Sequence, residues 1–424
     1  MIAAQSRAIA LSPTPASPMK IVCSRSIFAF VLTAAMLAQS GRVRASPDHS
    51  KVPGVVIAHS PKSSQIYLGS AGICVLPDGT YLAKHDEFGP GSTEKTRAIT
   101  RVYRSFDKGK SWEQISRVED LFWASIFPHR GAVYLMGTSA THRHGHAVIR
   151  RSTDGGRSWT EARDGNSGRL FPDISYHTAP TPVIIHGGRI WRAMEDEKGG
   201  EKWGTMFRAF MLSAPEDADL LKASNWTASN ALPHDKSWLD GKFGGWLEGN
   251  AVVTPAGDIV DILRVDYRDL PEKAAIVRFS GDGRTATFDA SRDFIDFPGG
   301  CKKFVIRWDA PSKRYWTLSN ATLPAYAGGN IERIRNTQVL MSSADLHTWT
   351  PHEVVLHHPD VNTHGFQYLD WLVDGEDLLI VSRTAYDDGM GGAMNQHNSN
   401  YLTFHRLKQF RKAVNSRVEV ATHR

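Results

Sequence analysis

The stretch GICVLPDGTYLAKHD, residues 72–86, contains two apolar segments separated by a tight Pro-Asp-Gly turn. Asp-Gly is a dipeptide that short hairpin turns favour, because both residues tolerate the backbone conformation that the turn requires. The flanking segments are rich in the valine, isoleucine, leucine and tyrosine residues that are typical of buried strands. The stretch therefore predicts an antiparallel β-hairpin.

The same unit recurs five more times along the chain. The further copies are ASIFPHRGAVYLMGT (124–138), TPVIIHGGRIWRAMED (181–196), NAVVTPAGDIVDILRVD (250–266), KKFVIRWDAPSKRYWTLSN (302–320) and QYLDWLVDGEDLLIVSRT (367–384). One unit is too small to bury its own faces, so neighbouring units must stack. Radial stacking of four-stranded sheets gives a β-propeller, and we predict an all-β fold with six blades. The segment VPGVVIAHS (52–59) is expected to add a strand to the last blade and close the ring.

A second pattern, Ser-x-Asp-x-Gly-x-x-Trp, lies between these units. It occurs as SFDKGKSW (105–112) and STDGGRSW (152–159), with degenerate copies SGDGRTATF (280–288) and SSADLHTW (342–349). The aspartate can accept backbone N–H bonds across a tight turn, the glycine permits the turn, and the tryptophan packs beside it. We predict that this pattern stabilises the outer hairpin of a blade and has no catalytic role.

The charge distribution gives no reason to expect a nucleic-acid partner. The net charge is +6, but residues 1–45 hold five of the 50 basic residues and none of the 44 acidic ones. The remaining 45 basic and 44 acidic residues nearly cancel, so the body of the protein lacks the positive field that binds polyanions. We expect no cofactor either, because the sequence contains no nucleotide-binding glycine loop or zinc-type spacing.

The first 45 residues have the features of a secretory signal. The apolar run IFAFVLTAAMLA (27–38) follows Lys20 and Arg25 and precedes small residues, with Met1 or Met19 as the start. We therefore expect a secreted or periplasmic protein that contacts no membrane once the signal is removed. Residues 46–410 are predicted to form one propeller domain, and residues 411–424 a solvated basic tail. Cys74 and Cys301 are too few for a disulfide framework and are expected to be buried free thiols.

Because of these repeats the chain resembles the sialidase (neuraminidase) superfamily, whose propellers carry the aspartate turn as the BNR or Asp-box repeat. The resemblance covers most of residues 60–405. It implies a carbohydrate-active enzyme with a glycan substrate. Sialidases use a tyrosine nucleophile with a glutamate base, an aspartate general acid, and three arginines that bind the carboxylate of the sugar.

Four positions of this sequence match that pattern. The stretch LEGNAVVTPAGDIVDILR (247–264) places Glu248 at the base and Arg264 at one of the arginines. The stretch RIRNTQVLM (333–341) places Arg335 at another, and FQYLDWLVDGEDLLIVSR (366–383) places Tyr368 at the nucleophile. The resemblance implies that Glu248 takes the phenolic proton as Tyr368 attacks the sugar.

Two positions depart from the pattern. The first arginine of the family aligns with Gly69, and the general acid aligns with Glu94, although Asp86 is also near. Loss of an arginine removes one charge-assisted contact to a carboxylate. The resemblance therefore implies hydrolysis of a terminal glycosidic bond in an acidic or otherwise polar glycan, with an incomplete arginine triad.

Two alternatives remain open. In the stretch 175–196, Tyr176, His177 and Arg192, together with His144, suit a polysaccharide lyase, in which arginine neutralises a uronate carboxylate while tyrosine or histidine removes the C5 proton. The other alternative is a glycan-binding propeller without catalysis, which needs only an aromatic and arginine lining. Its candidate residues are Trp191, Trp246 and Trp371.

The stretch THRHGH (141–146) spaces His142, His144 and His146 two residues apart, which predicts that they lie on one face of a strand. No cysteine or nearby carboxylate completes a metal site, so we predict a polar pocket wall rather than a bound metal.

Overall fold

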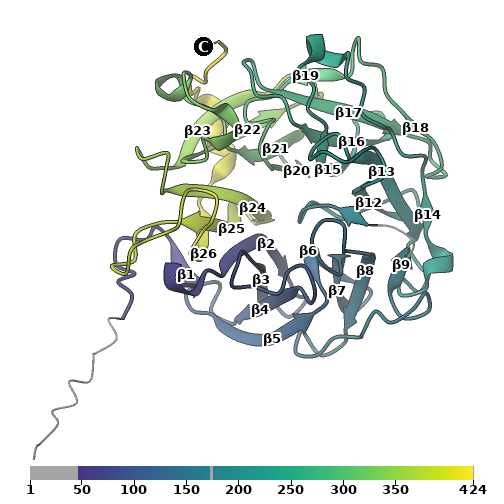
Figure 1. Cartoon of the computed structure of the whole chain (residues 1–424), viewed down its shortest axis with the longest axis horizontal. Helices are drawn as coiled ribbons and strands as arrows, with labels where there is room; N and C mark the ends of the chain where they lie inside the picture. Colours follow the sequence, from purple (N-terminus) through teal and green to yellow (C-terminus); the bar gives the residue numbers. More distant parts are fainter. Residues whose placement is uncertain (1–45, 172–174, 424) are drawn as a thin grey trace, which may run out of the picture. The chain divides into compact units, whose positions relative to one another are not determined.

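A computed structural model describes residues 46–171 and 175–423, so the predicted targeting segment, 1–45, lies outside the described residues. The described residues form six antiparallel sheets that surround a common centre like the blades of a propeller (Figure 1). The prediction of an all-β, six-bladed propeller is confirmed. None of the helices in 46–171 and 175–423 is long and apolar enough to cross a membrane.

The first three blades follow one another along the chain. Blade one contains β2 (Tyr67–Val75), β3 (Tyr81–Phe88), β4 (Ile99–Ser105) and β5 (Glu113–Glu119). Blade two contains β6 (Phe122–His129), β7 (Ala132–Thr138), β8 (Ala147–Ser152) and β9 (Arg169–Phe171). Blade three contains β10 (Tyr176–His177), β11 (Ile184–His186), β12 (Arg189–Asp196), β13 (Arg208–Pro215) and β14 (Thr227–Ala228). Its inner strand is interrupted, because β10 and β11 both pair with β12.

The last three blades complete the ring. Blade four contains β15 (Trp246–Val253), β16 (Ile259–Val265), β17 (Lys273–Phe279), β18 (Ala286–Thr287) and β19 (Phe294–Asp296). Blade five contains β20 (Val305–Asp309), β21 (Arg314–Ser319), β22 (Thr337–Ser343) and β23 (Thr350–His357). Blade six contains β24 (Gly365–Asp374), β25 (Asp377–Ala385), β26 (Tyr401–Leu407) and β1 (Val55–His59).

The expected closure of the ring is confirmed, because β1 pairs antiparallel with β26 and so joins the start of the propeller to its last blade. The six predicted hairpins coincide with the two inner strands of each blade. Short 3-10 turns lie in the connections, at η1 (Lys62–Ser64), η2 (Ala223–Asn225), η3 (Trp238–Gly241), η4 (Pro324–Tyr326), η5 (Ile331–Arg333) and η6 (Phe410–Asn415).

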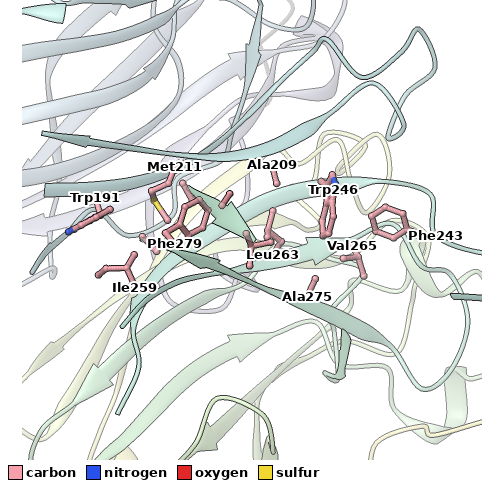
Figure 2. Close-up of a cluster of buried hydrophobic side chains, with 14 of the residues drawn as sticks. Trp191, Ala209, Met211, Phe243, Trp246, Ile259, Leu263, Val265, Ala275 and Phe279 are labelled. Carbon is pink, nitrogen blue, oxygen red and sulfur yellow. The ribbon is translucent and has the colours of Figure 1, made fainter. Parts of the chain in front are cut away.

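The hydrophobic core is divided among the spaces between neighbouring blades. Figure 2 shows the cluster between blades three and four, where Trp191 and Met211 of one blade face Leu263 and Phe279 of the next. Equivalent clusters join the other adjacent blades and also join blade six to blade one. Burial of apolar area is the dominant favourable contribution to folding, so each blade is stable only beside its neighbours.

The hydrogen bonds expected of the aspartate turns are present. Asp107, between β4 and β5, accepts a bond of 2.9 Å from the backbone N–H of Ser111, and the Trp112 indole donates to the carbonyl of Gly109 at 3.2 Å. Gly109 has a φ of +87°, and a Cβ there would lie 2.2 Å from the ring of Phe404 in β26. The same bond to the residue four positions on recurs at Asp154, whereas Asp282 and Asp345 accept from backbone N–H groups two and three positions on.

The segment after β26 differs from the expected solvated tail. Phe410 and Ala413 are buried in the cluster between blades five and six, and Arg411 forms an ion pair of 2.6 Å with Asp309. The prediction was based on the basic residues alone, and it overlooked the apolar residues between them that pack against the propeller. Cys74 and Cys301 are free and buried, as expected.

The three tryptophans proposed to line a glycan surface belong to the core instead. Trp191, Trp246 and Trp371 are at most 1% exposed, so the prediction that they line a binding surface is wrong. Trp371 also donates from its indole nitrogen to the carbonyl of Val305, at 3.2 Å, and so ties blade six to blade five.

We expect Trp371→Ala to lower the free energy of unfolding by about 3–5 kcal/mol, because it leaves a large cavity between two blades. Trp308→Ala is the control: Trp308 is 47% exposed, and its loss should cost much less. Urea unfolding followed by circular dichroism measures both. Equal midpoints for the two variants would contradict this account of the core.

Candidate active site

A cavity of about 270 Å³ opens at the centre of the propeller, and residues from all six blades line it. Its lining contains aromatic, acidic and basic side chains close together. The lining includes Gly69, Phe88, Glu94, Trp123, His142, His177, Glu248, Arg264, Glu332, Arg335, Tyr368, Arg383 and His397.

Tyr368, Glu248 and Arg264 form a hydrogen-bonded group in this cavity. The Tyr368 hydroxyl donates to Glu248 Oε1 at 2.7 Å. Arg264 Nη1 donates to the other carboxylate oxygen, Oε2, at 2.6 Å and lies 3.3 Å from the Tyr368 hydroxyl. The three residues come from β24, β15 and β16, so two different blades supply a phenol, a carboxylate and a guanidinium in direct contact.

The pKa shifts of this group set its resting protonation state, with the proton on the phenol and the carboxylate ionised. Burial by itself would raise the pKa of Glu248, but the charges of Arg264 and His177 and the hydrogen bonds from Arg264 and Tyr368 hold it below its ordinary value. Glu248 is therefore an ionised acceptor. Burial raises the pKa of Tyr368, and the Glu248 carboxylate raises it further, so the phenol keeps its proton until a base removes it.

β-Bulges aim several of these side chains into the cavity. Pairing between β15 and β16 shifts at Glu248, and pairing between β24 and β25 shifts just after Gln367, at Tyr368. Glu248 has a φ of 26° and Tyr368 a φ of 50°, and the inner-strand residues Ser70 and Trp123 also have positive φ. A left-handed backbone at a bulky residue is unusual and costs about 1–3 kcal/mol, and such residues cluster at active sites. The extra residue of each bulge thus turns the side chain toward the propeller centre.

Arg335 lies beside the Tyr368 group and is held by Glu332. Arg335 Nη2 donates to the Glu332 carboxylate, Nη1 donates to Gln367 Oε1 at 2.7 Å, and Nε donates to the Glu332 carbonyl at 3.0 Å. The Glu332 carboxylate also lies 3.8 Å from Arg264 Nη2. Glu332 therefore links the two arginines that the sequence placed in the site.

The structure separates the two candidates for the general acid. Glu94 lines the cavity, its carboxylate accepts one bond of 3.3 Å from the Gly89 N–H, and burial raises its pKa. Asp86 is fully buried and accepts bonds from Lys84, from Thr100 and from the Trp123 N–H, so it is absent from the cavity lining. Glu94 is thus the accessible carboxyl of the two.

The residues proposed for a lyase do not form one group. His177 lines the cavity, with its Nδ1 2.9 Å from Glu195 Oε2. Tyr176 points the other way into the core between blades two and three, because adjacent residues of a strand face opposite sides. Arg192 is buried outside the cavity lining and donates to Thr178 and Thr181. His144 is exposed in a turn. The prediction that these four residues share a cleft is wrong.

The three histidines of residues 141–146 do not share a face. They precede β8, which begins at Ala147, and lie in a turn and its exit. His142 lines the cavity and stacks on His177, with ring centroids 5.4 Å apart, whereas His146 contacts Arg169. The prediction assumed a strand where the chain turns: Arg143 has a φ of 63°, and a Cβ on Gly145 would lie 2.1 Å from the Ala140 carbonyl oxygen. Within residues 46–171 and 175–423, no three histidine, cysteine or acidic side chains are placed to share a metal ion.

Sequence reasoning missed Arg383 and Glu332. A signal for Arg383 existed in the internal repeat. In blade four, Arg264 pairs with Leu247, the residue before Glu248, and in blade six Arg383 pairs with Gln367, the residue before Tyr368. The two arginines therefore occupy equivalent positions of their blades, which aligning the copies 250–266 and 367–384 would have revealed.

No protein-family model matches this chain, and no curated protein matches it. Among solved structures, the chain is similar to an α-L-arabinanase from Penicillium chrysogenum complexed with arabinobiose, with a TM-score of 0.53 and 16% identity over 84% of this chain and 98% of the arabinanase. A Hadza microbial sialidase gives a TM-score of 0.54 and 14% identity over 84% of this chain and 68% of the sialidase.

A sialidase from Trypanosoma rangeli, in complex with a difluorinated nononic acid, gives a TM-score of 0.53 and 13% identity over 82% of this chain and 54% of that protein. At these identities the likeness establishes the fold alone. The fold is a propeller like those of the arabinanase and the two sialidases.

Proposed function

We propose that this propeller is an exported glycoside hydrolase that cleaves a terminal glycosidic bond of an acidic or polar glycan, with Tyr368 as nucleophile. The observation that carries the proposal is the 2.7 Å hydrogen bond from the Tyr368 hydroxyl to the ionised Glu248 inside the central cavity. A nucleophile within hydrogen-bond reach of a base that a third group orients is the usual arrangement for covalent catalysis. Secretion or export to the periplasm is proposed from the signal-like segment within residues 1–45.

The reaction follows in two steps. In the first step the Tyr368 oxygen bonds to the anomeric carbon as its proton passes to Glu248, and the bond to the leaving oxygen breaks while Glu94 protonates that oxygen. In the second step water attacks the anomeric carbon and gives a proton to Glu94. The Tyr368 oxygen leaves and recovers its proton from Glu248. The configuration at the anomeric carbon is retained.

Arg264 positions the base in this scheme. Its contact with Glu248 Oε2 leaves Oε1 facing the phenol, and its Nε is anchored on the Cys301 carbonyl at 2.9 Å. Its positive charge also stabilises phenolate character on Tyr368 as the proton leaves.

The proposal is tested by incubating the secreted chain with aryl glycosides of neutral, uronic and ulosonic sugars and with uronate polymers. Hydrolysis releases a saturated reducing sugar of retained configuration, which NMR identifies. β-Elimination, for which His177 is the lyase candidate that lines the cavity, instead yields an unsaturated uronate with new ultraviolet absorbance. The elimination product, or binding without turnover across the panel, would overturn the hydrolase proposal.

The pH profile should identify Glu94 as the acid. Because burial raises its pKa, Glu94 stays protonated to a higher pH than an exposed glutamate, and kcat/KM should fall as pH rises through that pKa. On the acid side, kcat/KM should fall as Glu248 becomes protonated. Glu94→Gln should lose about 10²–10⁴-fold in kcat/KM for glycosides with poor leaving groups and lose the alkaline limb.

Leaving-group chemistry supplies the control for Glu94. The dinitrophenolate group of a dinitrophenyl glycoside leaves without being protonated, so Glu94→Gln should retain most of its activity on that substrate.

Asp86→Asn should instead lower stability, because Asp86 holds Lys84 and Thr100 in the core. An alkaline limb that persists in Glu94→Gln would assign the acid to another residue.

A further inference from the structure

Arg383, near the end of β25, has an environment that the mechanism above does not use. Its side chain is buried, with the residue only 4% exposed, yet it lines the central cavity. The guanidinium carbon lies 4.4 Å from the centroid of the Phe88 ring and 4.8 Å from that of Tyr368. Stacking on two aromatic rings fixes the plane of the guanidinium and leaves its N–H edge for polar partners.

That edge is mostly unoccupied. Arg383 Nη2 donates to the His397 carbonyl and lies 3.3 Å from His397 Nδ1. Its Nε is buried and has no hydrogen-bond partner among the described residues. His397 offers no negative charge, because burial and the charges of Arg383 and Arg335 hold its pKa well below the ordinary value and keep the ring neutral.

The charges around Tyr368 do not balance. Arg264 is paired with Glu248, and Arg335 is paired with Glu332, whereas no carboxylate among the described residues lies within ion-pair distance of Arg383. Burial is the main cause that lowers the pKa of Arg383 to about 9, and the charge of Arg335 also acts to lower it, against the opposing effect of Tyr368. A buried charge without a counter-ion is costly, so the arrangement favours an anion brought by a ligand.

Gly69 leaves room beside this arginine. It lines the same cavity, and a Cβ at this position would meet the Phe88 ring at 3.2 Å. The absence of a side chain at residue 69 therefore lets Phe88 lie where it supports Arg383. A planar guanidinium beside two rings can offer its remaining N–H groups to the two oxygens of a carboxylate.

We propose that Arg383 is a specificity-determining residue that binds a carboxylate group on the sugar attacked by Tyr368. This inference rests on the proposed hydrolase function and narrows its substrate to glycosides of acidic sugars. The contact comes from blade six, on the strand next to the one that carries Tyr368. The carboxylate of the substrate is thereby held close to the reacting phenol, while Glu248 and Glu332 remain paired with their own arginines.

The test compares matched substrates that differ only in charge: 4-methylumbelliferyl glycosides of uronic and ulosonic acids, and the corresponding primary amides. The wild-type chain should prefer the acids. Arg383→Gln should lower kcat/KM for the preferred acid by about 10–100-fold, as expected for loss of a charge-assisted bond, and should change kcat/KM for its amide by less than about threefold. Arg383→Lys, which retains the charge without the planar fork, should be intermediate.

Arg268→Gln is the matched control. Arg268 lines the same cavity but is already paired with Asp266 at 2.7 Å, so its loss removes the same charge and should affect acid and amide equally. Wild-type hydrolysis of acid and amide at equal rates, or an equal loss on both substrates in Arg383→Gln, would overturn the carboxylate assignment while leaving the hydrolase function intact. A preference for sulfated over carboxylated glycosides would also overturn it.

A binding measurement separates failure of this inference from failure of the proposed function. If no glycoside is hydrolysed, the free acid sugars are titrated calorimetrically against wild type and Arg383→Gln at constant ionic strength. Acid binding that weakens about 10–100-fold in the variant supports the anion site even without turnover. Equal binding in the two proteins, or no binding to wild type, rejects it. Melting temperatures of all variants establish that they are folded.

Discussion

Tyr368→Phe is expected to lower kcat by a factor on the order of 10³ or more while changing the dissociation constant for glycan by less than about threefold. The substitution removes only the oxygen that would form the bond to the anomeric carbon, and the ring that contacts Arg383 and Arg335 remains. An effect on kcat without an effect on binding distinguishes a nucleophile from a residue that only shapes the cavity.

Tyr315→Phe is the matched control for this experiment. Its hydroxyl also makes a 2.7 Å hydrogen bond, to the Val253 carbonyl, but it lies between blades four and five away from the cavity lining. That variant should lose some stability and no activity. Mass spectrometry of wild type with a slow fluorinated glycoside should locate the sugar on the peptide that contains Tyr368. Full activity in Tyr368→Phe would refute the nucleophile assignment.

Glu248→Gln should cause the second large loss, about 10²–10⁴-fold in kcat/KM, because an amide cannot take the phenolic proton. The same change leaves Arg264 without its carboxylate in a buried site. Breaking a buried ion pair by removing one partner costs about 3–5 kcal/mol, so the free energy of unfolding should fall as well.

Glu272→Gln separates these two effects. Glu272 forms a buried ion pair with Lys302 at 2.8 Å, outside the cavity, so its variant should lose comparable stability and retain kcat. Activity is measured well below the melting temperature of each variant. If Glu248→Gln and Glu272→Gln fall equally in stability and both keep wild-type kcat, Glu248 does not act as the base.

The repeats predicted the architecture well, because a propeller is specified by local features. Turn dipeptides and strand composition occur within about 15 residues, and the aspartate turns place the outer hairpins. The pairing of β1 with β26 was expected because an unpaired edge at the last blade needs a strand, and a suitable segment precedes blade one. In the site, the structure brings Tyr368, Glu248, Arg264, Arg335 and Glu94 to one cavity, as their matched positions suggested.

The errors have two causes: composition does not reveal what neighbouring blades cover, and it does not fix where a strand begins or which side each of its residues faces. Tryptophan is a residue type that often lines binding surfaces, but Trp371 is covered by the adjacent blade. Tyr176 and His177 are consecutive, and only the course of the strand decides that the histidine enters the cavity. His144 was assigned to a strand that begins three residues later.

By itself the sequence determined the number of blades and the position of each hairpin, because these depend on turns and on alternating patterns over short distances. The positions of Tyr368 and Glu248 came from the resemblance to the sialidase superfamily. Only the tertiary structure decided which charges meet. Ring closure brings Phe88 of blade one against Arg383 of blade six, and β-bulges with left-handed residues turn Glu248 and Tyr368 toward each other. Contacts between residues some 120 to 300 positions apart depend on how all six blades pack, and no local pattern encodes them.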